Sequence, residues 1–431
     1  MSTQALQAGA RSEATTAAVR NILFVATLLL AWISASPFTT LADPNFNEAA
    51  DNSDLFNQIA YVALAMSVAT YVLIHEPQRL RPLLRPAYVA MIAWLALSVA
   101  TSLDAAVSAK RLAYALLVFV LAGALPLLPA NLKRFADLSA AAVSIVLALC
   151  YAGVMLVPDL AVHQAFDVLE PLLAGDWRGT FAHKNIAGPM MANFLFFGLF
   201  IARARSAVLG YGIAAAAGIF LWFAHAKAST GLLPLVLLLS VLAVRTRSTF
   251  VCALLVFGPA IVLNLFTVGS LYLESVKAVD TVILTDPTFT GRNDIWQFAI
   301  DNIRDRPWLG HGFGAFWQIP VTVFQPSSEG SMATTASHAH NAFLDLTLTI
   351  GIPGMLLAVL WTLVLPFVDW QRSRAAGADN DLIQLFLRIW MFALYTGSFE
   401  SILFERGSAP WFTMLLAMFG LRYLSVARLA R

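Results

Sequence analysis

The residues best suited to chemistry lie in one polar segment, from position 285 to position 345. It contains Arg292, His311, His338 and His340, together with further arginines and several carboxylates. An imidazole accepts a proton near neutral pH, and a guanidinium holds an anionic group through charge-assisted hydrogen bonds. Because this segment is the only long polar interruption in an otherwise apolar chain, we take it as the first candidate for a catalytic site.

The composition places these residues in a membrane protein. Of the 431 residues, 59% are hydrophobic and 12% are charged, whereas a soluble domain has about 25% charged residues. The apolar residues form runs of about 17–22 positions, each long enough to cross a hydrocarbon core of about 30 Å as a helix. We expect contact with membrane lipids and no nucleic-acid partner. The net charge of +2 says little about partners, because the useful signal is where the charges lie.

The hydrophobic runs predict an all-α integral membrane protein with about twelve transmembrane helices and one large outer loop. Basic residues occur in alternate loops and the intervening loops are acidic, so the positive-inside rule places both termini in the cytoplasm and the polar segment outside. The predicted helices cover residues 20–37, 55–74, 86–103, 111–129, 137–158, 185–202, 207–225, 229–244, 249–268, 341–366, 382–403 and 409–425.

The predicted helices and loops divide the chain into three parts. Residues 1–268 hold nine helices with short loops, 269–340 form the large loop with an amphipathic helix, and 341–431 hold the last three helices and a cytoplasmic C-terminus. More helices follow the first apolar run, so we predict an uncleaved first helix rather than a signal peptide. Cys150 and Cys252 lie toward opposite faces on this map, which favours packing residues over a disulfide.

Two other outer loops carry cationic residues. Arg178, His183 and Lys184 precede the helix at 185–202 and could hold an anionic group at its start, where backbone N–H groups also point. The alternative is that Asn185 caps this helix and Lys184 reaches toward lipid headgroups. Lys227, in the short loop after residue 225, is either an interfacial anchor or a cation that faces a cavity.

The large loop has its own internal pattern. Apolar residues at helical spacing predict an amphipathic helix over 293–304, which Pro307 ends. Gly310, Gly312 and Gly314 then allow a tight backbone path. They do not form a dinucleotide-binding motif, because no strand precedes them.

His338 and His340 alternate before the helix at 341–366. Two histidines at this spacing could share a metal ion. No cysteine and no clear third ligand accompanies them in the sequence, so we predict no metal site. A histidine that acts as general base, held by Asn341 or Asp345, is the favoured interpretation.

These segments together resemble the bacterial O-antigen ligase and O-antigen polymerase superfamily, most closely its exopolysaccharide-polymerase-like branch. The matching pieces are GTFAHKNIAG at 179–188, the segment around Lys227, TGRNDIWQFAIDNIRDRPWLGHGFGAFW at 290–317 and HAHNAFLDLTLTIGIPG at 338–354. The most specific are the block from Gly291 to Gly314 and the His340–Asn341 pair. With the helix pattern, the resemblance covers nearly the whole chain.

The resemblance implies a fold similar to lipid-dependent, GT-C-like glycosyltransferases and a place in the bacterial inner membrane with the large loop in the periplasm. It also implies a glycan donor on undecaprenyl diphosphate, no metal or nucleotide cofactor, and other envelope polysaccharide-assembly proteins as partners. The family's histidine before an asparagine corresponds to His340, and its large-loop arginine corresponds to Arg292. A further family cation is usually arginine, whereas this chain has Lys227, which cannot make a bidentate fork to a diphosphate.

The expected activity is therefore metal-independent glycosyl transfer to an acceptor sugar, of the exopolysaccharide or O-antigen polymerase type. We predict His340 as base and Arg292 as diphosphate ligand, assisted by Lys227 or Lys184. His338, His183 and Arg178 are further candidates for substrate binding. The alternatives are an O-antigen ligase that uses lipid A-core as acceptor, and a lipid-linked oligosaccharide flippase or transporter. A flippase usually places its charges deep within helices, whereas here they gather in outer loops.

Overall fold

The computed structural model describes residues 3–35, 37–41, 55–168, 170–283, 291–317, 319, 336–405 and 407–426. Within these ranges the regular structure is helical, with one isolated antiparallel bridge between Val162 and Trp177. The predicted all-α class is therefore confirmed. The part of the large loop at 284–290 and most of 318–335 lies outside the described residues.

Each of the twelve predicted segments contains a helix. The first nine are α1 (Thr3–Ile33), α3 (Leu55–His75), α4 (Pro86–Ala100), α5 (Ala105–Ala124), α6 (Leu132–Leu156), α8 (Lys184–Ala204), α9 (Ala207–Phe223), α10 (Lys227–Arg245) and α11 (Thr249–Phe266). The last three are α15 (Ala342–Val359), which continues through η7 (Leu360–Val364) and α16 (Leu365–Ala375), then α17 (Asn380–Thr396) and α18 (Ala409–Val426). The outer loops add α7 (Pro158–Ala161), α12 (Glu274–Ile283) and α13 (Arg292–Asp305).

Nine helices among the described residues are long and apolar enough to cross a membrane. A tenth is added when η1 (Pro77–Leu83) and α4, which are bent by 72° relative to each other, are counted as one span. The other two predicted spans, α9 and α17, have 17 residues each and are about 25 Å long at 1.5 Å per residue. The chain is a multi-pass membrane protein.

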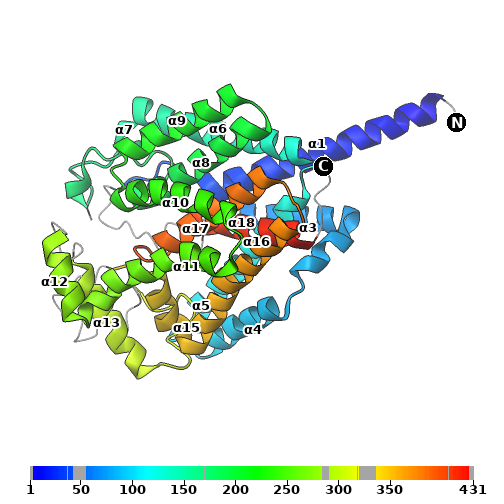
Figure 1. The fold of residues 1–431 in the computed structure, drawn as a ribbon. Helices are drawn as coiled ribbons and strands as arrows, with labels where there is room; N and C mark the ends of the chain where they lie inside the picture. Colours follow the sequence, from blue (N-terminus) through cyan, green and yellow to red (C-terminus); the bar gives the residue numbers. More distant parts are fainter. Residues whose placement is uncertain are drawn as a thin grey trace.

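The best-buried helices lie at the centre of the molecule. In α8 and α18, 72% and 83% of the spanning window is buried, compared with 22% in α3 and α11. Figure 1 shows α17 and α18 in the middle of the bundle, and α4, α6, α9 and α12 at its periphery. Of these, α4, α6 and α9 expose large apolar side chains, as expected for surfaces that lipid covers.

Both chain ends lie on one side of the bundle. In Figure 1 the N-terminal half of α1 and the end of α18 are on the right, whereas α12 and α13 are on the left. The described helices of the large loop thus lie at the end of the bundle opposite the first half of α1 and the end of α18.

The large loop is anchored on a break in α15. Gly351 has φ 72° and ψ 173°, values that interrupt the helix, and the exposed backbone groups are paired with the loop. His311 N–H and Gly312 N–H donate to the carbonyls of Leu348 and Thr349, and Ile352 N–H donates to the carbonyl of Pro307. A broken helix is tolerated at membrane depth when its freed backbone groups find partners in this way.

The helix predicted over 293–304 corresponds to α13. Its apolar side, with Ile295, Phe298 and Ala299, packs on Phe316 and Trp317 of the loop and on Leu348 of α15. His311, buried to 5% exposure, links the same two helices, because its Nε2 donates to the carbonyl of Asn302 over 2.9 Å. His311 therefore has a structural role in the described part of the loop.

We predict that Gly310→Ala destabilises the protein. Gly310 has φ +67°, and an added Cβ would lie 2.5 Å from the backbone of Thr349. The side chain would both disfavour this backbone conformation and separate the loop from α15, at a cost of about 2 kcal/mol or more. The melting temperature of the purified protein should fall by several degrees.

The matched control is Gly212→Ala in α9, where an added Cβ meets nothing within 4 Å. Alanine favours a helix more than glycine, so this variant should melt at the wild-type temperature or above. Equal melting temperatures for the two variants would contradict the role given to Gly310.

Candidate active site

His340 lies directly before α15 in a backbone conformation that few residues other than glycine adopt. Its φ is +48°, which costs free energy unless the surroundings impose it. The next residue, Asn341, supplies that constraint. Its side chain accepts hydrogen bonds from Phe343 N–H and Leu344 N–H, and its amide donates to Asn264 Oδ1 of α11 and to the carbonyl of Ser398.

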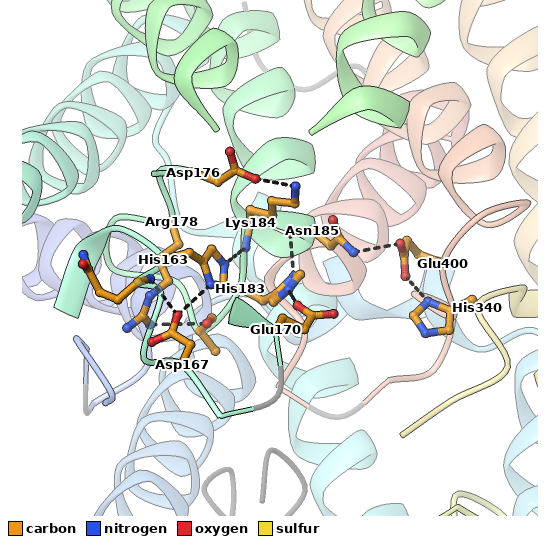
Figure 2. Close-up of polar contacts among 12 residues, drawn as sticks. His163, Asp167, Glu170, Asp176, Arg178, His183, Lys184, Asn185, His340 and Glu400 are labelled. Atoms are coloured by element: carbon orange, nitrogen blue, oxygen red, sulfur yellow. Dashed lines mark hydrogen bonds and ion pairs between the residues drawn. The ribbon is translucent and has the colours of Figure 1, made fainter. Parts of the chain in front are cut away.

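Glu400, in the loop between α17 and α18, is the centre of the candidate site. Its carboxylate is paired with His340 Nδ1 over 2.9 Å and with Arg292 Nη2 over 2.8 Å. Asn185 Nδ2, from the first turn of α8, donates to the same carboxylate over 3.2 Å. Figure 2 shows Asn185 and His340 on either side of Glu400. Three segments that are far apart in the sequence thus meet at one side chain, which is only 13% exposed.

The charge of Glu400 is fixed by its neighbours. Burial alone would raise the pKa of Glu400, but the positive charge of Arg292, the charge of and hydrogen bond from His340, and the charge of His338 outweigh it. The pKa of Glu400 therefore lies well below its usual range, and the group is ionised throughout the physiological pH range.

An ionised Glu400 sets the tautomer of His340. A carboxylate only accepts hydrogen bonds, so Nδ1 of His340 carries the proton and donates it to Glu400. The second ring nitrogen, Nε2, then has a free lone pair, and it points away from the carboxylate in Figure 2. This arrangement resembles the histidine–carboxylate pair of a catalytic triad, in which the carboxylate orients the base and stabilises its protonated form.

Arg292 is the first residue of α13. It follows Gly291, whose φ of +81° turns the chain into the helix. The guanidinium donates from Nη1 to the carbonyl of Phe399 and from Nη2 to Glu400, and its side chain is 20% exposed. A guanidinium has five N–H donors, so donors remain beyond these two bonds for an anionic ligand.

The residues expected to hold His340 have other partners. Asn341 caps α15, as described above, and Asp345 accepts hydrogen bonds from Trp317 Nε1 over 2.7 Å and from Ala339 N–H over 3.1 Å. The prediction that the side chain of Asn341 or Asp345 holds the His340 ring is therefore wrong, because the carboxylate of Glu400 does so. The Nδ1 of His338 accepts the backbone N–H of His340, and the centroids of the two rings are 4.2 Å apart.

The first turn of α8 also differs from the sequence-based alternative. His183, not Asn185, caps this helix, because its Nδ1 accepts the N–H of Asn185 over 3.0 Å. Asn185 is thereby free to reach Glu400. The cap residue pairs with the carboxylate of Glu170 through its other ring nitrogen.

The cations proposed near α8 are already neutralised or buried. Lys184 Nζ lies 2.5 Å from Asp176, whose other oxygen binds His225 Nδ1 over 2.6 Å. Arg178 is 0% exposed, and its guanidinium donates to the carbonyls of Thr39, Phe181 and Ala182. In this structure Arg178 stabilises the loop through these bonds to backbone carbonyls.

Lys227 is the first residue of α10 and is exposed. Within the described ranges it has no carboxylate within ion-pair distance. The preceding residue, Ala226, packs on Gly188 of α8, where an added Cβ would lie 2.4 Å from it. Of the candidate lysines and arginines in the described ranges, Lys227 is thus the exposed one that has no carboxylate within ion-pair distance.

His338, His340 and Glu400 could in principle hold a metal ion, since their ligand atoms lie within 4.8 Å of one another. Two histidines and a glutamate are a known zinc ligand set. Here Arg292 and His340 already occupy the carboxylate of Glu400. A metal ion would have to displace a guanidinium from its partner and then bear that positive charge at close range.

Comparison with known proteins agrees with the resemblance seen in the motifs. Residues 190–359 match a family model described as O-antigen ligase, a region that includes Lys227, Arg292 and His340 but neither Asn185 nor Glu400. A curated relative, the "Exopolysaccharide production protein ExoQ" of Rhizobium meliloti (strain 1021), is 26% identical over 145 residues, or 33% of this chain. The match spans about a third of the relative's length, at 32%.

Fold and site together define a multi-pass membrane protein with a histidine–carboxylate–arginine set at one end of its helical bundle. The family match and the curated relative confirm the resemblance to the O-antigen ligase and polymerase superfamily.

A second histidine, His163, lies in the same outer region and is 1% exposed. Its Nδ1 pairs with Asp167 over 3.2 Å, and its Nε2 accepts the N–H of Lys184 over 3.3 Å. Burial and the nearby charge of His183 lower the pKa of His163 to about 4. It is therefore neutral at neutral pH and joins the Asp167 loop to the start of α8.

We predict that His163 makes the protein less stable in acid. Its pKa is lower in the folded protein than the usual 6.5, so the unfolded chain binds the proton more readily and stability falls as pH decreases from about 6.5 to 4. In His163→Gln the fall in melting temperature over this pH range should be smaller. The control is His75→Gln, which changes an exposed histidine and should keep the wild-type slope. Parallel curves for wild type and His163→Gln would contradict the prediction.

Proposed function

We propose that this protein is a bacterial inner-membrane glycosyltransferase of surface-polysaccharide assembly. It transfers a glycan from undecaprenyl diphosphate to an acceptor sugar, in the manner of an exopolysaccharide or O-antigen polymerase. The observation that carries the proposal is the position of Glu400 between a histidine and an arginine. One carboxylate thereby positions both groups that such a reaction requires, a proton acceptor and a fixed cation.

The reaction is a displacement at the anomeric carbon of the donor. The acceptor hydroxyl gives its proton to His340 Nε2, and its oxygen forms the new bond to the anomeric carbon. The bond from that carbon to the diphosphate oxygen breaks, and the lipid diphosphate leaves with the electron pair. Glu400 stabilises the imidazolium that forms, as the carboxylate of a triad does.

Positive charge is needed where the diphosphate leaves. Arg292, with its remaining N–H donors, binds the diphosphate, and Lys227 contributes a second cation without bidentate geometry. No metal ion is required when fixed cations neutralise the leaving group. Lys184 and His183, each paired with its own carboxylate, position the α8 loop rather than the diphosphate. His338 positions His340.

In this proposal the site faces the periplasm and both termini are cytoplasmic. The placement is supported by the basic residues in alternate loops and by the position of α12 and α13 opposite the chain ends (Figure 1). A lipid-linked donor with its glycan on the periplasmic side can reach only a site on that face.

A second candidate is an O-antigen ligase, because the matching family model carries that description. A ligase would use the same base and cation and would take lipid A-core as acceptor. The name of the curated relative, an exopolysaccharide production protein, and the motif resemblance favour the polymerase. Loss of surface polymer in a deletion strain supports a polymerase, whereas polymer that is made but not joined to lipid A-core supports a ligase.

We predict that His340→Ala lowers the rate of glycan transfer about 10²- to 10⁴-fold, the usual contribution of a general base. The rate is measured with purified protein in liposomes and lipid-linked donor extracted from cells. His75→Ala, at an exposed position outside the site, is the control. Near-normal transfer by correctly inserted His340→Ala protein would refute the role of this residue.

Glu400 is proposed to act through His340 and Arg292, so the two conservative variants should differ. Glu400→Gln removes the charge that stabilises the imidazolium, and we expect a loss of at least about 10²-fold. Glu400→Asp keeps the charge and should recover part of the rate. If Gln and Asp gave equal rates at wild-type melting temperature, Glu400 would have only a structural role.

For Arg292 we predict that lysine cannot replace arginine. Arg292→Lys keeps the charge but loses the planar fork that serves Glu400, the Phe399 carbonyl and the diphosphate together, so transfer should fall about 10²-fold or more. The matched control is Arg304→Lys on the same helix, where the arginine is exposed and pairs with Asp301. A fully active Arg292→Lys protein would exclude bidentate binding by this residue.

A further inference from the structure

A separate cavity of about 110 Å³ adjoins the base. It lies between the start of α15, the N-terminal half of α5 and the loop after α17, and its lining includes Arg111, Trp317, His338, Asp345, Ser401 and Glu405. His338 is in ring contact with His340, and Ser401 directly follows Glu400. The cavity is therefore next to the catalytic set, whereas Arg292, His340 and Glu400 themselves are not among its lining residues.

Ser401 is the first sign that this cavity holds a ligand. Its side chain is 4% exposed, and its Oγ has no hydrogen-bond partner within the described residues. Buried hydroxyl groups in proteins nearly always have a partner. A molecule bound in the cavity that reached the Ser401 hydroxyl would supply the missing hydrogen bond.

Asp345 provides a second polar group on the wall. Trp317 Nε1 and Ala339 N–H both donate to its Oδ1, which fixes the carboxylate and the indole ring together. Its Oδ2 takes part in neither of these bonds. A carboxylate oxygen of this kind accepts a hydrogen bond from a hydroxyl group, and the Trp317 ring beside it offers an apolar surface to the same ligand.

The charged residues on the cavity wall indicate which part of the substrate this cavity can bind. Asp345 and Glu405 contribute two acidic groups, against one arginine, Arg111, and the imidazole of His338. Such a lining has no excess of fixed positive charge, which a diphosphate would need to offset its own negative charges. Hydroxyl groups and an aromatic ring suit a neutral sugar.

We propose that this cavity is the acceptor subsite and binds a neutral saccharide ring. Hydroxyl groups of the ring bond to Ser401 Oγ and Asp345, and the ring packs against Trp317, so that another hydroxyl is presented to His340. The donor diphosphate then lies toward Arg292, on the other side of Glu400. This inference rests on the proposed function, because it names the class of acceptor for the same reaction.

The test measures binding of two probes to the full-length protein in lipid nanodiscs. One probe is the lipid-free oligosaccharide repeat released by mild acid from the cell's own lipid-linked donor, and the other is undecaprenyl diphosphate. In Ser401→Ala the Kd of the oligosaccharide should rise about 3- to 10-fold, the usual effect of one lost hydrogen bond. The Kd of undecaprenyl diphosphate should stay unchanged.

A matched control exists in Ser139→Ala on α6. Ser139 is also buried with an unpartnered hydroxyl, but it is not among the residues that line the cavity. Neither serine has a hydrogen bond to lose, so both alanine variants should fold, and Ser139→Ala should bind both probes as wild type does. Asp345→Asn is the second variant at the cavity and should raise the oligosaccharide Kd about 10-fold.

Three results would overturn the inference. These are no binding of the oligosaccharide to wild type, an unchanged oligosaccharide Kd in both cavity variants, or a rise in the Kd of undecaprenyl diphosphate instead. Failure of the proposed function gives a different pattern. Wild type would then transfer no glycan from the lipid-linked donor, while weaker oligosaccharide binding by Ser401→Ala would still support a sugar site in this cavity.

Discussion

The structure of the site depends on one buried carboxylate with three partners. Glu400 joins His340, Arg292 and Asn185, which come from the start of α15, the start of α13 and the first turn of α8. A buried carboxylate without compensating charge would take up a proton, because desolvation penalises its charged form. The guanidinium and imidazole keep it ionised, and the ionised carboxylate in turn fixes their positions. The positions of His340 and Arg292 are therefore set by the same interaction.

The rest of the fold brings these segments together. The break in α15 at Gly351 exposes backbone groups that pair with the segment after α13, which holds Arg292 near the start of α15. Asn341 ties that start to α11 and to the α17–α18 loop through Asn264 and Ser398. Each link satisfies backbone or amide groups that would be costly to leave unpaired at membrane depth.

Much of the fold could be predicted from sequence, because a span of apolar residues has few options other than a membrane helix. The twelve predicted segments contain α1, α3 to α6, α8 to α11, α15, α17 and α18. The positions of the helix ends were predicted less accurately, since hydrophobicity alone does not mark the residue at which a helix begins or ends. The segment predicted at 382–403 extends past the end of α17 at Thr396, and the last part is the loop that contains Glu400.

The site was predictable only in part, for a physical reason. His340 and Arg292 belong to sequence motifs, whereas Glu400 is a single acidic residue in a loop that reads as the end of a helix. Its importance arises from tertiary contacts over 60 and 108 positions of sequence. The carboxylates of Asp176 and Glu170 likewise neutralise Lys184 and His183, which a count of cations in a loop does not indicate. In the sequence, the presence of acidic residues close to Lys184 and His183 would have been the only signal that these cations are paired.

The location of Glu400 also indicates which parts of the bundle are free to move. The helices on either side of its loop, α17 and α18, have most of their side chains buried, whereas only 22% of the spanning window is buried in α3 and in α11. Closely packed helices resist displacement, because interiors at crystal-like density have little room for rearrangement. In the proposed reaction, a long polyprenyl chain that enters from the bilayer would therefore displace outer helices and leave the carboxylate stationary. Admission of the proposed donor and the geometry of the candidate site would then belong to different layers of the same bundle.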